Sequence, residues 1–339
     1  MLGVHVNWTA PFAVRRPDAE YALDPLELLT STAAALFWRK QGGEMVLYTD
    51  SRGVGFYREV GVVDAYDHID VSCLDAYTAR CGVDPALAPC VARMHVLGSI
   101  PHPFVAMDLD FVLADPGCFP YREADLCCLH WELPTPPWYP PFEEQFIPEG
   151  FPLPTDLDFA TLVPNIAFLY VAVPEFFRSY AALAESYAIR SVEANANVPP
   201  NRIAIFADQR LMGMLASKHG LIFQSLLNDM WTCGPHGRHW EALRRKRGMG
   251  VSDDPRNLIA PFWVVDRGRF DERKESVDYV HLWFEKAVFS AEDQHAPGRS
   301  AVLRALVERT EREFAHAPVW RRLKEWLSAS GANVAAWQT

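Results

Sequence analysis

Hydrophobic and polar positions follow two alternating periods along the first 130 residues. Short apolar runs predict strands, and they lie at 3–8, 44–50, 66–74 and 103–113. Between these runs, apolar positions at helical spacing predict helices at 24–39, 52–60 and 90–100. Strands that are apolar on both faces are typical of a parallel sheet covered by helices on both sides. The pattern therefore predicts an α/β fold with a mostly parallel central sheet.

A segment rich in proline and aromatic residues, 133–154, interrupts this pattern. Each proline removes a backbone donor and fixes φ, so the segment cannot form a regular helix or a central strand. We expect it to be either a surface connection or a stiff wall beside a substrate cleft. The strand pattern resumes at 161–173, and helices are expected at 174–187 and 208–219.

The end of the chain predicts a pair of basic helices at 300–328, within a C-terminal appendage, 291–339, on one large domain, 1–290. Trp320 and Trp326 lie among cationic residues there, a composition that suits either a membrane-surface helix or a helix docked on the domain. Acidic residues interrupt the positive face, which favours docking.

Composition and charge narrow the class of protein. The chain has 339 residues and a formal net charge of −11, so we expect no nucleic-acid partner, because phosphate binding needs a basic field. The seven cysteines are odd in number and include no Cys-x-x-Cys pair, which fits reduced thiols. The first residues lack a signal-peptide pattern, and no apolar run approaches the ~20 residues of a membrane helix. We therefore expect a cytoplasmic protein without a transmembrane segment.

Two carboxylates, Asp108 and Asp110, interrupt the apolar run at 103–113. Burying two like charges without compensation would cost several kcal/mol each, so we expect a neutralising cation. That cation is either an arginine or lysine side chain or a divalent metal, which carboxylate oxygens suit. A second Asp-x-Asp, Asp156 and Asp158, follows the proline-rich segment, where an exposed acidic turn is the simpler interpretation.

Several short motifs together resemble one enzyme class. The first Asp-x-Asp is preceded by a strand that ends in LYTD, at 47–50, and followed by ADQR at 207–210 and HLWFEK at 281–286. In this order they resemble the GT-A glycosyltransferases, in the branch of glycogenin-like and capsular-polysaccharide-type enzymes, over roughly 1–290. The resemblance implies a Rossmann-like GT-A fold, a nucleoside-diphosphate sugar (UDP-sugar) donor, a glycan, peptide or small-molecule acceptor, and Mn²⁺ or Mg²⁺.

The resemblance also implies a metal site. Asp108 would face the ribose and the metal, Asp110 would ligate the metal, and His281 would complete its shell. Lys286 would contact the phosphates, although the family has a glycine before this lysine and the chain has Phe-Glu. The alternative interpretation is that His281 is a structural histidine whose hydrogen-bond partners lie within the protein.

The same resemblance places Asp208 and Gln209 on the sugar. Asp208 would hold sugar hydroxyls or the acceptor, and Gln209 would lie near the anomeric carbon. Helix capping is the alternative for Asp208, and Arg210 stands where the family has a second acid. Asn165 would contact donor hydroxyls or stabilise a strand turn.

Nucleotide contacts are expected at the carboxyl ends of the first two strands, where ligands bind in open parallel sheets. The candidates are Val6, Asn7 and Trp8 on the first strand, with Thr49 and Asp50 on the second. Trp8 would stack on the base or pack in the core.

The sequence thus predicts a metal-dependent glycosyltransferase that retains the anomeric configuration. Two alternatives stay open. One is a haloacid-dehalogenase-type phosphatase, which also uses a strand-end Asp-x-Asp with Mg²⁺ and whose later acidic pair the segment Ser252-Asp253-Asp254 would supply. The other is a non-catalytic GT-A-like protein that binds sugars or serves as a scaffold.

Overall fold

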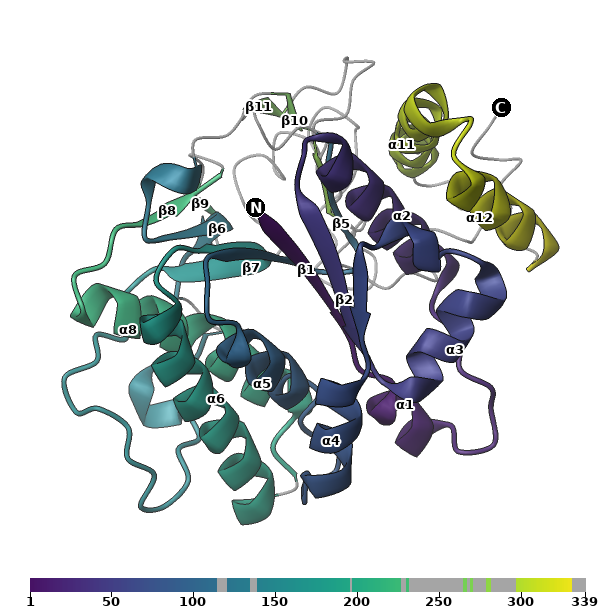
Figure 1. Ribbon diagram of the computed structural model, residues 1–339. Coiled ribbons are helices and arrows are strands. Elements are labelled where there is room, and N and C mark those ends of the chain that lie inside the picture. Colours follow the sequence, from purple (N-terminus) through teal and green to yellow (C-terminus); the bar gives the residue numbers. More distant parts are fainter. Residues whose placement is uncertain are drawn as a thin grey trace.

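The computed structural model describes residues 1–114, 121–134, 139–195, 197–226, 230–231, 265–266, 269–270, 279–281 and 297–330. Its central sheet has the strand order β3-β2-β1-β4-β7-β6-β8, with β9 paired to β6 (Figure 1). The strands are β1 (Leu2–Asn7), β2 (Glu44–Thr49), β3 (His68–Asp70), β4 (Phe104–Met107), β6 (Leu126–Glu132), β7 (Val163–Val171), β8 (Phe223–Ser225) and β9 (Met230–Trp231).

Most neighbours in this sheet are parallel. β1 pairs in parallel with β2 and β4, β2 with β3, and β6 with β8 and β9. Only β7 runs against its neighbours β4 and β6 among these strands. The predicted mostly parallel sheet is confirmed, although the sequence analysis did not identify β6, which is almost fully buried.

A second, four-stranded sheet begins directly after β4 of the central sheet. Its strand order is β11-β10-β12-β5, with β5 at Phe111–Leu113, β10 at Val265–Asp266, β11 at Arg269–Phe270 and β12 at Tyr279–His281, all antiparallel. The apolar run at 103–113 is therefore two strands in two sheets, and the prediction of one interrupted strand is wrong. The chain turns at Asp108–Asp110, where the Phe111 amide donates to the Asp108 carbonyl at 3.1 Å.

Helices cover both faces of the central sheet, as predicted. They are α1 (Ala10–Arg15), α2 (Pro25–Lys40), α3 (Ser51–Val60), α4 (Ser72–Arg80), α5 (Val91–Ser99), α6 (Pro174–Ala194), α7 (Pro200–Ala204), α8 (Leu211–Lys218), α11 (Pro297–Phe314) and α12 (Pro318–Ala329). One buried cluster lies under α2, α3, α11 and α12, and a second under α4, α5, α6 and α8. Short turns complete the elements: η1 (Val63–Ala65), η3 (Tyr121–Glu123), η4 (Phe142–Glu144) and η5 (Ile205–Arg210).

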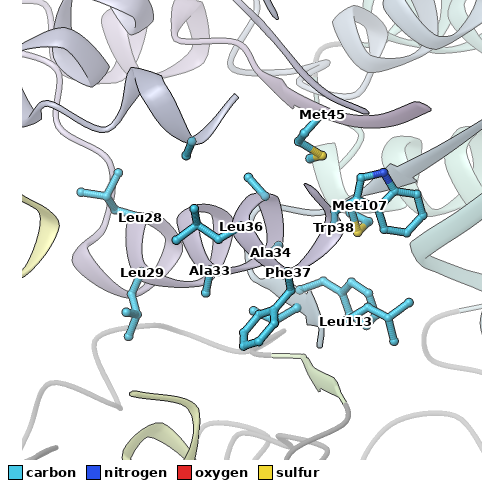
Figure 2. Close-up of a cluster of buried hydrophobic side chains, with 14 of the residues drawn as sticks. Leu28, Leu29, Ala33, Ala34, Leu36, Phe37, Trp38, Met45, Met107 and Leu113 are labelled. Atoms are coloured by element: carbon cyan, nitrogen blue, oxygen red, sulfur yellow. The ribbon is translucent and has the colours of Figure 1, made fainter. Parts of the chain in front are cut away.

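Helix α2 begins as its sequence predicts. Asp24 accepts a hydrogen bond from the Leu26 amide at 2.8 Å, and Pro25 occupies the first helical position, where its missing N–H costs nothing. Figure 2 shows buried side chains of α2, among them Trp38 and Phe37, in one cluster with Met107 of β4 and Leu113 of β5. This helix therefore packs against the chain on both sides of the Asp108–Asp110 turn.

The C-terminal helices pack onto the domain. Trp320 is fully buried, and the Trp326 ring lies 5.6 Å from the ring of Phe56 on α3. Arg322 forms an ion pair with Asp64 at 3.0 Å. Docking, the favoured expectation for this appendage, is confirmed. Among the described residues, no helix combines the length and the apolar character needed to cross a membrane.

Two further expectations differ from the structure. The predicted strand at 66–74 is shorter, because β3 ends at Asp70 and α4 begins at Ser72. Asp70 accepts from the Cys73 amide at 3.0 Å, which turns the chain into the helix. The proline-rich segment forms no regular helix or strand in its described parts, 133–134 and 139–154, as expected, and these parts contain only the short turn η4.

Candidate metal centre and active site

Asp108, Asp110 and His281 come together at one point. Each offers a ligand atom, and these atoms all lie within 4.8 Å of one another. The pairing of β12 with β5 places His281 opposite Phe111, so its imidazole reaches the turn, with Nε2 3.9 Å from Oδ1 of Asp110. The structure therefore brings together the three residues that the sequence analysis proposed as metal ligands.

The turn that carries the two carboxylates is held from two sides. The Asp108 amide donates to the Ala167 carbonyl of β7 at 2.9 Å. On the other side, the Thr30 hydroxyl of α2 donates to the Leu109 carbonyl at 2.6 Å. Asp110 and His281 are both buried, whereas the side chain of Asp108 is 37% exposed. Fixed backbone on both sides gives the carboxylates a defined geometry.

Arg93 supplies one of the cations that the carboxylates require. It extends from α5 and places Nη1 3.0 Å from Oδ1 of Asp108, while Nη2 donates to the Ile166 carbonyl at 2.9 Å. An arginine side chain and a divalent metal can therefore both neutralise this site. The Arg93 guanidinium pairs with Asp108, while the two carboxylates and the His281 imidazole still converge on one point. Arg93 is not among the predicted site residues, although a cation in the apolar helix predicted at 90–100 is a signal for such a role.

Asp208 lies inside a continuous helical stretch. Helix α7, the turn η5 and helix α8 run on from Pro200 to Lys218, so the capping interpretation of Asp208 is wrong. The turn η5 is π-helical, a wider turn that often occurs at functional sites. The Tyr180 hydroxyl lies 2.8 Å from the Ala207 carbonyl and 2.7 Å from the Asp208 carbonyl, which stabilises this widening.

The carboxyl group of Asp208 is electrostatically linked to the Asp108 region. Burial raises the pKa of Asp208 to about 7, the Arg93 guanidinium lowers this pKa, and the Asp108 carboxylate raises it. Among the described residues, Oδ1 of Asp208 is buried without a hydrogen-bond partner. A carboxyl group in this state, close to a cation, is suited to binding a ligand hydroxyl.

Gln209 belongs to a hydrogen-bonded network beside Asp208. Its amide oxygen lies 3.0 Å from the hydroxyl of Tyr139, which also binds Oε2 of Glu132. Asn165 donates from Nδ2 to Oε1 of Glu132 at 3.0 Å, and Nε2 of His130 lies 3.2 Å from the same oxygen. The predicted residues Gln209 and Asn165 are therefore connected through Glu132 and Tyr139.

Glu132 and Tyr139 were missed by the sequence analysis. Glu132 ends β6, and Tyr139 comes from the proline-rich segment, so only the fold shows that they meet. Burial raises the pKa of Glu132, but hydrogen bonds from His130, Tyr139 and Asn165 outweigh burial and hold it below its ordinary value. Glu132 is therefore a carboxylate at neutral pH.

Residues at the carboxyl ends of β1 and β2 make hydrogen bonds within the protein. Asp50 caps α3 by accepting from the Gly53 amide at 2.9 Å, and it also accepts from the amide and hydroxyl of Thr9 at 2.8 Å. The Thr49 hydroxyl donates to the Asn7 carbonyl at 2.8 Å. These bonds join the two strand ends, and a nucleotide contact by these residues stays a prediction.

Asn7 and Trp8 also have partners in the protein. Nδ2 of the Asn7 side chain donates to the Tyr57 hydroxyl at 3.3 Å, and Oδ1 accepts from the Tyr21 hydroxyl at 2.9 Å. Nε1 of Trp8 donates to Thr78 at 2.7 Å, and its ring lies edge-on to Tyr77 with the ring centres 5.8 Å apart. Val6, in register with Tyr48, belongs to the same strand end. The stacking of Trp8 on a base stays a prediction.

Lys286, the predicted phosphate contact, lies outside the described residues. The same holds for Ser252, Asp253 and Asp254, which carry the acidic pair of the phosphatase alternative.

No protein-family model matches the chain, and no curated protein matches it either. Solved structures with some similarity include the galactosyltransferase LgtC in complex with donor and acceptor sugar analogs, at 10% identity over 91% of this chain and 96% of that chain, with a TM-score of 0.41. The inositol-1-phosphate CTP transferase from T. maritima is 12% identical over 74% of this chain and 98% of that chain, with a TM-score of 0.33. Mouse xyloside xylosyltransferase 1 is 12% identical over 66% of this chain and 84% of that chain, with a TM-score of 0.31.

Proposed function

We propose that this chain is a metal-dependent glycosyltransferase that transfers a sugar from a nucleoside-diphosphate sugar to an acceptor. A UDP-sugar is the proposed donor, and a glycan, peptide or small molecule the proposed acceptor. The observation that carries the proposal is the convergence of Asp108, Asp110 and His281 within 4.8 Å, close to a second set of polar residues around Asp208. A cation would stabilise the charge on a diphosphate leaving group, and polar groups would hold the sugar.

The donor set fits the proposed ion. Two carboxylates and one imidazole suit Mn²⁺, and Mg²⁺ favours the same carboxylate oxygens. The partly exposed Asp108 leaves an approach for a ligand, whereas Asp110 and His281 are anchored in the core. When bound, Mn²⁺ or Mg²⁺ would stabilise negative charge that develops on a diphosphate leaving group.

The protein's own residues would then orient the sugar. Arg93 lies between Asp108 and the Asp208 region and contributes a fixed positive charge near a diphosphate. With a pKa of about 7, Asp208 exists in both protonation states at neutral pH, so it can donate to or accept from a sugar hydroxyl. Gln209 would lie at the anomeric carbon, and with an amide in that place we propose retention of configuration.

The nucleotide would bind at the carboxyl ends of β1 and β2, beyond the sheet edge, where open α/β sheets bind ligands. Asn7, Trp8, Thr49 and Asp50 define that edge. Asn165 is proposed to contact donor hydroxyls, and Lys286 the phosphates.

The test is a panel of nucleotide sugars incubated with the full chain in Mn²⁺, Mg²⁺ or a chelator. We expect release of the nucleoside diphosphate with metal and none with the chelator. Hydrolysis of an aryl phosphate without turnover of any nucleotide sugar would instead identify a phosphatase. Metal-dependent binding of a nucleotide sugar without turnover would identify a sugar-binding protein.

Anomeric configuration is tested separately. Proton NMR of the first product formed shows directly whether the donor's configuration is kept. An inverted product would contradict the proposed retention while leaving the glycosyltransferase assignment intact.

A further inference from the structure

The hydroxyl of Tyr139 lies between two side chains that both present oxygen to it. It binds Oε2 of Glu132 and lies 3.0 Å from Oε1 of Gln209. The Tyr139 side chain is almost fully buried and packs against Val163 and Ile205, so its hydroxyl has little freedom to move. Its position relative to both neighbours is thus fixed by the core.

A phenol has one proton and can donate only one hydrogen bond. Glu132 is the stronger acceptor because charge-assisted hydrogen bonds are about twice as strong as neutral ones. Asn165 also donates to Glu132, and hydrogen bonds keep its pKa low, so this carboxylate stays ionised and claims the proton of Tyr139. Gln209 must then donate to the phenolic oxygen rather than accept from it.

An amide can satisfy this requirement by a half-turn. Rotation of the Gln209 side-chain amide exchanges its NH₂ and its oxygen in nearly the same volume. The NH₂ group then donates to the Tyr139 oxygen, and each group in the chain Gln209–Tyr139–Glu132 has a complementary partner. The Gln209 oxygen then becomes the end of the amide directed away from Tyr139.

We propose that Tyr139 is a positioning residue, which Glu132 polarises and which fixes the Gln209 amide with its nitrogen on the phenol and its oxygen toward the ligand. This inference rests on the proposed function, since it assigns that oxygen to the anomeric carbon of a donor sugar. Positive charge develops on that carbon in the oxocarbenium-like transition state of glycosyl transfer. An amide oxygen stabilises this charge, whereas an NH₂ group in the same place would repel it.

The first test is the kinetics of Tyr139→Phe. The variant keeps the buried ring and removes the hydroxyl, so the Gln209 amide loses its fixed orientation while donor contacts elsewhere stay. We expect kcat to fall about tenfold or more, with the KM for the nucleotide sugar changed less than about twofold. The matched control is Tyr66→Phe, which removes a buried hydroxyl that hydrogen-bonds His5 at 3.1 Å in the core cluster under α2 and should leave kcat unchanged.

The second test reads hydrogen-bond direction from thermal unfolding and needs no substrate. In Gln209→Glu, one hydroxyl faces two carboxylates, so we expect Tm to fall by about 4 °C or more. Adding Glu132→Gln to this variant restores a complementary set of hydrogen bonds in the opposite direction. The new amide at position 132 donates to Tyr139, and Tyr139 donates to the new carboxylate at position 209. Glu132→Gln should therefore raise the Tm of Gln209→Glu, although it lowers the Tm of the unchanged protein.

The outcomes separate the inference from the proposed function. Normal kcat in Tyr139→Phe, in a chain that turns over nucleotide sugars, overturns the inference and leaves the glycosyltransferase assignment standing. If no nucleotide sugar is turned over, the proposed function fails, and the thermal test still decides the orientation of Gln209. A Tm that Glu132→Gln lowers in both backgrounds overturns the inference.

Discussion

Two Asp-x-Asp sequences lie in this chain in very different surroundings. Asp108 and Asp110 stand where β4 gives way to β5, with Arg93 3.0 Å from one carboxylate and His281 3.9 Å from the other. Asp156 and Asp158 lie on an exposed loop. There Asp156 pairs with Lys218 on the surface, and Asp158 accepts from the Ala160 amide at 2.8 Å.

The difference shows that position in the fold, rather than the motif, decides what two neighbouring acids do. On the loop, water and flexible side chains neutralise the charge at little cost, so the pair has a local role. At the strand ends, fixed backbone and partial burial force the carboxylates to share cations. Matched variants in the two Asp-x-Asp pairs therefore test most directly whether Asp108 and Asp110 have a functional role.

The largest effect is expected for Asp110→Asn, which removes a ligand charge without changing the shape of the side chain. We expect turnover of the nucleotide sugar to fall by about 10²- to 10³-fold and the Mn²⁺-dependent rise in Tm to disappear. Initial rates and thermal shifts measure both. Full activity in this variant would contradict the metal assignment.

The next effect concerns the two cations. Arg93→Ala leaves the Asp108 carboxylate and the neighbouring Asp208 without their guanidinium, and we expect unfolding free energy to fall by about 2–3 kcal/mol. Lys218→Ala removes the cation beside Asp156, where exposure limits the loss to about 0.5 kcal/mol. Urea titrations of both variants test the contrast. Equal losses of unfolding free energy in the two variants would contradict the stronger contribution expected of the Arg93–Asp108 ion pair over the Lys218–Asp156 ion pair.

A smaller effect is expected in the pH dependence of stability, measured without metal. The folded protein holds a proton on Asp208 up to a pKa of about 7, whereas the unfolded chain releases it near 3.8. This group's contribution to stability is thus complete below pH 4 and lost as the pH rises through 7. Between pH 4 and 8, the unfolding free energy of the unchanged protein should fall by about 1–2 kcal/mol more than that of Asp208→Asn. This difference is smaller than the full linkage value because the Asp208 side chain is only partly buried. Parallel curves for the two proteins would refute this.

The smallest effect is expected for Asp158→Asn, the counterpart of the first variant in the exposed pair. Its carboxylate accepts one backbone hydrogen bond, which an asparagine oxygen can also accept. Stability should change by less than about 0.5 kcal/mol, with activity unchanged. A loss of activity here would show that the wrong pair was assigned to the metal.

Local patterns predicted much of the fold. The Asp24–Pro25 start of α2 is a feature of adjacent residues, and the buried positions of the strands β1, β2 and β7 are mostly apolar. The prediction failed where polar residues ended an apolar run. Asp70 and the Asp108–Asp110 turn both stop a strand by hydrogen-bonding to neighbouring backbone, which hydrophobicity alone does not register.

The site was predicted in part. The acids at 108 and 110 were found because they interrupt an apolar run, and the histidine at 281 was found because a resemblance linked motifs that are far apart in sequence. Arg93, Glu132 and Tyr139 were not found, since each gains its meaning only from a partner on another element. The π-helical turn around Asp208 was also missed, because the sequence of the segment gives an ordinary helical pattern.

The crossing of the chain from the central sheet into the small antiparallel sheet has a consequence for assembly. The two carboxylates come before β5, but the imidazole arrives only when β12, far along the chain, pairs with β5. Closing such a long loop is entropically costly and slow, so the central sheet should form first. An ion held by Asp108, Asp110 and His281 would cross-link the two sheets, and chelation should then loosen β12 before it disturbs β1 or β2.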